Sequence, residues 1–406
     1  MSVRPIRRLA KLCLALGATA VLLEVGARLF FASSVGPRAI LYGTSWHRNV
    51  TLPSLPREDM QVHDDAQEGY TKYFPHEVKW GVDDRGRFPI RINNHGFRGR
   101  DFSMEKAPGV LRVLTLGASS TFGFGNHDDE TYPYLLEEIL HRRAGGTARF
   151  EVINFAIPHA TTTEILSMFR AEGLELRPDF VTLYEGVNDA KAAFMGAAYG
   201  GVWGILGRSL MLVELLNQLR PSLAVLPADA WSGEVATRAS EWFLANAAAL
   251  REECRRAGAH LIVASQQAKS ELVEREQMRG LRYEDEVTLV QESLRPGAEG
   301  SEWRTLVRGT DDPRDPRTPR LVRRLVQAHF GGIFLIHARI MHDLRQWAAA
   351  NGVDFVDVIQ ILDQDRHHLT SWVHLDRQAN QRVAEALAAR ILAPSRPGAA
   401  STGVDP

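Results

Sequence analysis

The sequence has few cysteines and almost no net charge. Only two cysteines are present, Cys13 and Cys254, and Cys13 lies within an apolar N-terminal stretch. An intramolecular disulfide is therefore not expected, and stability must come from packing. The 48 basic and 49 acidic residues nearly cancel. No overall field attracts a nucleic acid, so no nucleic-acid partner is expected, and any specificity for a charged ligand must be local.

The N-terminus has the pattern of a targeting segment. An apolar run from Leu12 to Leu23 follows four basic residues, Arg4, Arg7, Arg8 and Lys11. Continued to Phe31, the run reaches about the 20 residues that a membrane-spanning helix needs. We expect residues 1–34 to form a signal anchor or transmembrane helix, with the remaining chain on the extracytoplasmic, periplasmic side of the membrane. Cleavage near Ala18 to Ala20, which would release the protein, is the alternative.

The chain from residue 111 onward alternates short strands with longer helical segments. The predicted strands are Leu111–Leu116, Phe150–Phe155, Phe180–Tyr184, His260–Ala264 and Val353–Val358. The predicted helices are Tyr132–Arg143, Thr161–Glu172, Ala236–Ala257 and Ala379–Leu392. This alternation predicts an α/β fold, a three-layer α/β/α sandwich with a mainly parallel sheet.

The composition divides the rest of the chain into an extension, a domain with two insertions, and a tail. Residues 35–90 read as a linker and irregular extension, although Phe88 begins an alternating run that suggests a strand beside the main sheet. Residues 91–393 form the predicted α/β domain. Insertions near 191–230 and 270–330 interrupt its pattern, as lids or specificity loops commonly do. The tail, 394–406, reads as disordered.

Polar residues follow three of the predicted strands, where ligands bind in such sheets. Ser119 comes after the first strand, and its hydroxyl would be exposed at the edge of the sheet. A serine in this position is more often a turn former or a helix cap. Gly186 and Asn188 follow the third strand and offer an amide N–H and a carboxamide. His374, one of 14 histidines, precedes the last helix.

Taken in order, these segments resemble the SGNH (GDSL-like) hydrolase superfamily, and in particular its membrane-anchored bacterial members. The nucleophile block resembles residues 117–123, with Ser119 at the serine. The second block resembles residues 154–156, and the Gly-x-Asn-Asp block matches residues 186–189 unchanged. The Asp-x-x-His block resembles residues 371–374, and Asn93 to Gly99 also resembles anchored members. The resemblance implies a flavodoxin-like SGNH hydrolase fold.

The resemblance implies acyl transfer through a serine nucleophile. Ser119 would attack an ester carbonyl while His374 takes its proton, and the oxyanion would be held by the amides of Ser119 and Ala156 and by the Asn188 carboxamide. Gly186 belongs to the same site. Ala118 stands where the family has Asp, and Ala156 stands where the family has Gly.

The third departure concerns the carboxylate that orients the histidine. Ser371 occupies the position of the family's Asp. The histidine could be oriented instead by a backbone carbonyl, by Ser371, or by a carboxylate from Asp363 or Asp365. The sequence leaves these choices open.

The expected function is hydrolysis of a carboxylic ester, such as O-acetyl groups on an extracytoplasmic glycan. An O-acyltransferase with the same site and a non-catalytic glycan-binding scaffold are the alternatives. No cofactor is expected. No metal is expected either, because His159, His367 and His368 lack a recurring ligand spacing. The sequence does not indicate an oligomeric state.

Overall fold

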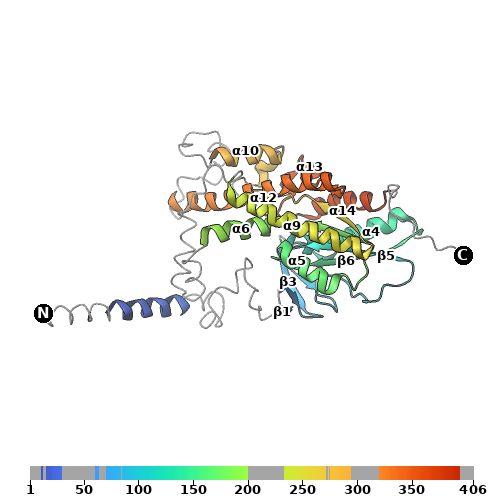
Figure 1. Cartoon of the computed structure of the whole chain (residues 1–406), viewed down its shortest axis with the longest axis horizontal. Coiled ribbons are helices and arrows are strands. Elements are labelled where there is room, and N and C mark those ends of the chain that lie inside the picture. The colour runs from blue at the N-terminus through green and yellow to red at the C-terminus, as the bar shows by residue number, and fades with distance from the viewer. Residues whose placement is uncertain are drawn as a thin grey trace.

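A computed structural model describes most of the chain (Figure 1). The described residues are 11, 15–29, 60–63, 70–83, 85–199, 233–270, 273, 275–293 and 320–393. Residues 200–230 and 294–319 of the two predicted insertions and the whole predicted tail, 394–406, lie outside these residues, so the expected roles as lids and as a disordered tail stay predictions.

A five-stranded parallel sheet forms the centre of the fold. Its strand order is β6-β5-β7-β8-β9, and every neighbouring pair is parallel. The strands are β5 Val110–Gly117, β6 Arg149–Ala156, β7 Phe180–Tyr184, β8 His260–Ala264 and β9 Asp354–Val356. This order is the doubly wound order of flavodoxin-like folds, in which the strand order reverses between the first and third strands. The reversal point therefore lies between β5 and β7.

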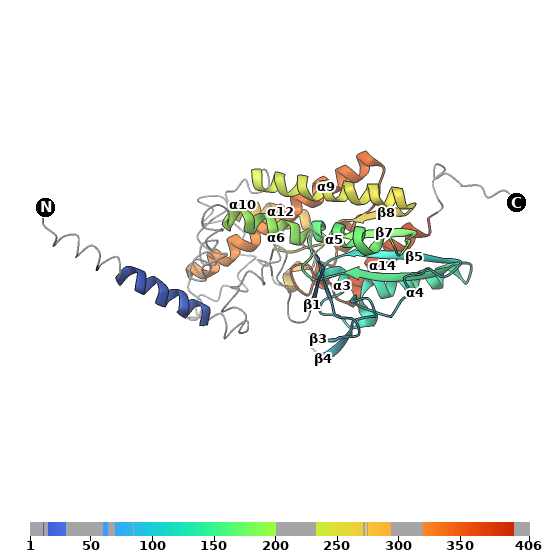
Figure 2. The same ribbon diagram turned by 60° about the horizontal axis from the view of Figure 1, so that its bottom comes forward.

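Helices cover both faces of the sheet (Figure 2). On one face, α4 (Tyr132–Ala144) packs against α14 (Arg377–Ile391). On the other face lie α5 (Thr162–Met168), α9 (Glu234–Ala257) and α12 (Arg320–Asn351), with α6 (Val187–Tyr199) packed against α9 and α12. The strands are buried on both sides because of these layers, which explains their nearly continuous apolar sequences. The predicted α/β fold is confirmed.

The predicted core elements agree closely with those observed. All five predicted strands form. The last of them, β9, is shorter than expected because Asp357 caps α13 (Val358–Leu362). The helix predicted over 161–172 divides into α5 and a π-helical turn, η3, over Phe169–Gly173. Short elements complete the domain: α3 (Ser119–Phe122), η2 (Asp128–Glu130), η4 (Arg275–Met278), α10 (Tyr283–Ser293) and η6 (Arg366–His368).

The N-terminal extension is more regular than the sequence suggested. It contains two antiparallel pairs, β1 (Met60–His63) with β2 (Tyr70–Tyr73), and β3 (Val78–Asp83) with β4 (Gly86–Arg91). The strand expected from Phe88 is β4, but it pairs with β3 in a separate hairpin and does not join the main sheet.

The described N-terminal helix spans residues 15–29. Within it, Arg28 Nε donates a hydrogen bond to Glu24 Oε1 at 2.8 Å. Among the described residues, no helix is both long enough and apolar enough to cross a membrane. The membrane helix expected over 1–34 stays a prediction.

Candidate active site

Ser119 stands immediately beyond the carboxyl end of β5. The chain leaves the strand through Gly117 and turns at Ala118 into the single helical turn α3, which begins at Ser119. A Cβ atom at Gly117 would lie 2.6 Å from the carbonyl oxygen of Tyr184 on β7. Only glycine therefore lets β5 and β7 approach closely enough here, which fixes the turn that presents the serine.

His374 comes from the loop before α14, yet it meets Ser119 directly. Its Nε2 lies 2.9 Å from Ser119 Oγ. The backbone carbonyl of His374 accepts a hydrogen bond from the Thr370 amide at 2.8 Å, which closes the loop into a tight turn. The structure thus brings the predicted nucleophile and the predicted base within hydrogen-bonding distance.

Ser371 lies on the other side of the imidazole. Its Oγ is 2.8 Å from His374 Nδ1, and it also accepts the His374 backbone N–H at 3.3 Å. If Nδ1 carries the ring proton, it donates to Ser371, and Nε2 is left free to accept a proton from Ser119. Of the candidates for the third position, Ser371 is the one whose side chain contacts His374.

The two carboxylates considered for that position are engaged elsewhere. Asp363 Oδ1 accepts the backbone N–H of Tyr283 at 2.6 Å, at the start of α10. Asp365 accepts a hydrogen bond from Arg382 on α14 at 2.7 Å. Both residues therefore serve to tie secondary-structure elements together. The spacing in sequence placed them near His374 but could not show where their side chains turn.

Burial lowers the pKa of His374 to about 4. The cause is desolvation, which disfavours the charged imidazolium. At neutral pH the ring is therefore uncharged, as a general base must be. A neutral hydroxyl at Ser371, unlike a carboxylate, does not raise this pKa.

Asn188, Gly186 and Ala156 lie at the neighbouring strand ends. One N–H of the Asn188 carboxamide donates to the Ala160 carbonyl at 3.1 Å. Since a carboxamide carries two N–H groups, the second can serve a ligand. Ala156 is the last residue of β6 and pairs with Gly117 of β5. A Cβ at Gly186 would lie 2.4 Å from the terminal methyl group of Met341, so a larger residue there would displace the Met341 side chain.

Two buried side chains that the sequence did not indicate, Gln266 and Ser120, connect these loops. Gln266 Oε1 accepts the Val187 N–H at 2.8 Å, and its Nε2 donates to Ser120 Oγ at 3.3 Å. Ser120 in turn donates to the carbonyl of Val373 at 3.0 Å, next to His374. The network links the loops that carry Ser119, Asn188 and His374. Its sequence signal is a polar Ser-Gln-Gln directly after the apolar strand β8.

Glu185 is a further buried side chain that the sequence did not indicate. One of its carboxyl oxygens accepts the backbone N–H of Asn188 at 3.0 Å. Burial raises the pKa of Glu185 to about 8, so the carboxyl is mainly neutral at pH 7. In the sequence, Glu185 lies between an apolar strand and Gly186. A carboxylic acid at such a position is normally expected in a solvent-exposed turn.

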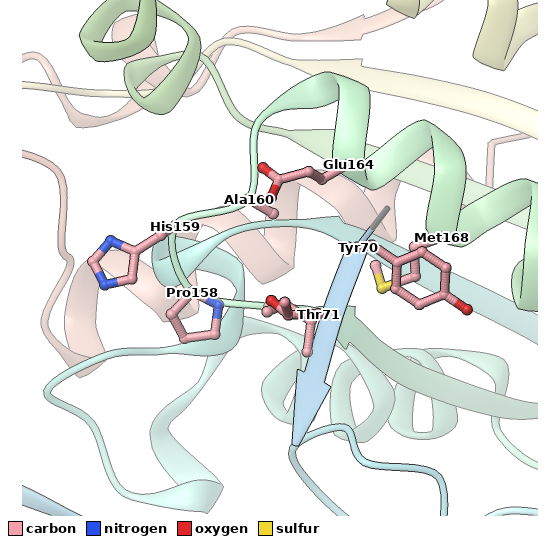
Figure 3. Close-up of a pocket in the computed structure, with 8 residues that line it drawn as sticks. Tyr70, Thr71, Pro158, His159, Ala160, Glu164 and Met168 are labelled. Carbon is pink, nitrogen blue, oxygen red and sulfur yellow. The ribbon is translucent and has the colours of Figure 1, made fainter. Parts of the chain in front are cut away.

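A small pocket lies behind the loop that joins β6 to α5, next to β2 (Figure 3). Its lining includes His159, which adopts a positive φ of 73°, and Glu164. Glu164 accepts the Thr161 N–H at 2.8 Å and caps α5. Burial raises the pKa of Glu164 to about 7. The residues that line the pocket do not include Ser119 or His374.

The other histidines considered for a metal lie apart from this pocket. The rings of His367 and His368 lie with centroids 4.1 Å apart and planes tilted by 36°, and His368 Nδ1 lies 2.8 Å from Asp376 Oδ2. Within the described part of the chain, no group of three or more His, Cys, Asp or Glu side chains could hold a metal ion.

Comparison with known proteins points to ester chemistry. Residues 115–303 match the GDSL-like Lipase/Acylhydrolase family. The matched segment contains Ser119, Gly186 and Asn188 and ends before His374. It supports a hydrolase that acts on ester bonds, the class of enzyme that the sequence motifs predict. No curated protein sequence matches the chain significantly.

Several solved structures are similar to this chain. They include a GDSL-like lipase from Bacteroides thetaiotaomicron, with 12% identity, a TM-score of 0.35, and coverage of 71% of this chain and 91% of that one. An acetyl xylan esterase has 15% identity and a TM-score of 0.36, covering 70% and 100%. A mutant of an acetyl-xylooligosaccharide esterase from Geobacillus has 13% identity and a TM-score of 0.37, covering 70% and 95%.

Proposed function

We propose that the protein is a serine esterase that works through an acyl-enzyme on Ser119. The observation that carries the proposal is the continuous contact from Ser119 Oγ to His374 Nε2, at 2.9 Å, and from His374 Nδ1 to Ser371 Oγ, at 2.8 Å. A serine in contact with a neutral imidazole, which is itself oriented by a third group, is the arrangement that activates a hydroxyl for nucleophilic attack.

In the first half of the reaction, His374 Nε2 takes the proton of Ser119 as the oxygen bonds to the ester carbonyl carbon. The resulting tetrahedral intermediate carries its negative charge on the former carbonyl oxygen. The free N–H of Asn188 and the amides of Ser119 and Ala156 stabilise this charge. When the carbon–oxygen bond to the alcohol breaks, the imidazolium returns the proton to the leaving oxygen. Water then repeats the steps and releases the acid.

Ser371 takes the place of the usual carboxylate in this proposal. Its hydroxyl fixes the tautomer and the orientation of His374, but it offers no negative charge to the imidazolium. The protein therefore retains the orienting role of the third residue and loses the electrostatic role. Slower catalysis than with a carboxylate, and activity that persists to lower pH, both follow.

For the substrate, we propose O-acetyl or similar short acyl esters on an extracytoplasmic glycan. The support is the basic and apolar N-terminus, which is typical of exported chains. The same site could pass the acyl group to a sugar hydroxyl in place of water. Whether acetate or a new ester forms in the presence of a glycan acceptor distinguishes these two reactions.

Hydrolysis of short-chain nitrophenyl esters tests the proposal. We expect activity in the wild-type protein and its loss in Ser119→Ala and His374→Ala. The matched controls are Asp363→Asn and Asp365→Asn, whose side chains contact other elements. A folded wild-type protein that hydrolyses no ester and transfers no acyl group would contradict the proposal and favour a glycan-binding scaffold.

A further inference from the structure

Phe124 exposes an aromatic ring beside the catalytic histidine. The residue is 54% exposed, and its ring centroid lies 4.9 Å from that of His374. Single exposed apolar side chains are common on protein surfaces and need no explanation. The position of this one is unusual, because it borders the imidazole whose Nε2 contacts Ser119.

The loop that carries Phe124 is held firmly from within the protein. Phe124 lies between Gly123 and Gly125, which adopt positive φ values of 86° and 80°. The buried guanidinium of Arg98 donates hydrogen bonds to three carbonyls of this loop and its approach, those of Phe122 at 3.1 Å, Gly123 at 2.8 Å and Asn126 at 2.6 Å.

Arg98 also pairs with Asp128 at 2.9 Å. It belongs to the Asn93–Gly99 segment, which precedes the α/β core in the sequence. This segment therefore sets the position of the loop that carries the exposed ring.

The chemistry of the site determines which part of a substrate meets this ring. His374 must donate its proton to the leaving oxygen of the alcohol, so this oxygen must lie within hydrogen-bonding reach of Nε2. In the proposed mechanism Asn188 and Ala156 hold the carbonyl oxygen instead. The Phe124 ring lies beside the imidazole that protonates the alcohol, which makes the alcohol the part of the substrate proposed to meet the ring.

We propose that Phe124 is a binding platform for the alcohol of the ester, and that this alcohol presents a flat, partly apolar face such as that of a pyranose ring. Aromatic side chains bind such faces by stacking, while the hydroxyl groups stay in water. The inference rests on the proposed esterase function and specifies the substrate class for the same site. Phe124 would act in recognition and not in proton transfer.

Three acetyl esters with different alcohols test this inference on the full-length protein. They are an acetylated methyl xylopyranoside, 4-nitrophenyl acetate and ethyl acetate, with release of acetic acid as the measurement. For Phe124→Ala we expect kcat/KM to fall about tenfold for the pyranoside, mainly through KM, and less than about twofold for ethyl acetate. The fall in kcat/KM for 4-nitrophenyl acetate should lie between these two values.

Two variants and a labelling measurement complete the test. Phe124→Trp should stay within about threefold of wild type on the pyranoside, because it keeps an aromatic face. Trp80→Ala removes a ring that is 53% exposed on the β3–β4 hairpin and stacks on Arg87, and it should change none of the three rates. Phe124→Ala should still be labelled on Ser119 by a fluorophosphonate probe.

An equal fall for all three esters, or no fall for the pyranoside, would overturn the inference while leaving the esterase proposal intact. Loss of probe labelling in Phe124→Ala would also overturn it, because the ring would then be needed to build the site. If the folded wild-type protein neither labels nor hydrolyses any ester, the esterase proposal itself fails, and this inference fails with it.

Discussion

Replacing Ser371 with aspartate would restore a carboxylate beside His374. The present hydroxyl oxygen lies 2.8 Å from His374 Nδ1, so a carboxylate at the same position reaches the ring after a small adjustment. Ser371 is only partly buried, which leaves room for the larger side chain. The substitution changes the charge next to the imidazole and keeps the hydrogen bond.

The expected gain follows from the charge that develops on His374 during the reaction. A hydrogen bond between neutral groups contributes about 1 kcal/mol net, and one to a charged group about 1.5–3 kcal/mol. The difference, about 0.5–2 kcal/mol, applies mainly once His374 is protonated. We therefore expect kcat to rise about 2- to 30-fold. The carboxylate also raises the pKa of His374, so activity should be lost at a higher pH than in the wild type.

Rates of 4-nitrophenyl acetate hydrolysis from about pH 3.5 to 8 provide the assay. Ser371→Asn is the matched control, because asparagine has the shape of aspartate without its charge and should give no gain. Ser371→Ala removes the acceptor and should lower kcat about tenfold. The reasoning is refuted if Ser371→Asp changes neither kcat nor the pH at which activity falls, or if Ser371→Ala behaves like wild type.

The remaining predictions concern pH, the unused carboxylates and stability. Because His374 acts as a base only when neutral, and burial lowers its pKa to about 4, wild-type kcat/KM should fall only as pH drops through about 4; a fall near pH 6.5 in a pH–rate profile would contradict this. Asp363→Asn and Asp365→Asn should each keep kcat within about threefold of wild type, since neither contacts His374; a 100-fold loss in steady-state rates would restore them as candidates. Glu286→Gln leaves the fully buried Arg366 without its carboxylate and should lower the free energy of unfolding by about 3 kcal/mol in urea titrations; a change below about 0.5 kcal/mol would show that this pair is not important for stability.

The core sheet could be predicted because its strands are buried on both faces. Short apolar runs bounded by polar turns are recognisable in a sequence as buried strands, and β5, β7 and β8 have this pattern. β3 could not be recognised in the same way. Val78 and Trp80 on one side of it are exposed, so this apolar side is not packed into the core, and the pairing of the strand with β4 depends on the turn between them.

The candidate site shows where reasoning from sequence stops. Ser119 and His374 could be proposed because their motifs follow a strand and precede a helix, although 255 residues separate them. The partner of His374 could not be chosen, because that choice depends on which way the side chains of one loop turn. Gln266 was missed because its one signal, a polar Ser-Gln-Gln after β8, does not show that the side chain is buried. Its role depends on contacts with residues distant in sequence.

Mapping the site of covalent labelling by a fluorophosphonate probe tests the central claim most directly. We expect the wild-type protein to take up one label, on the peptide that contains Ser119, with labelling lost in Ser119→Ala and strongly slowed in His374→Ala. Ser120→Ala is the informative control, because Ser120 is adjacent but donates its hydroxyl to the Val373 carbonyl; it should still be labelled at Ser119. Labelling that persists in Ser119→Ala, or a folded wild-type protein that takes up no label, would contradict an activated serine at this site.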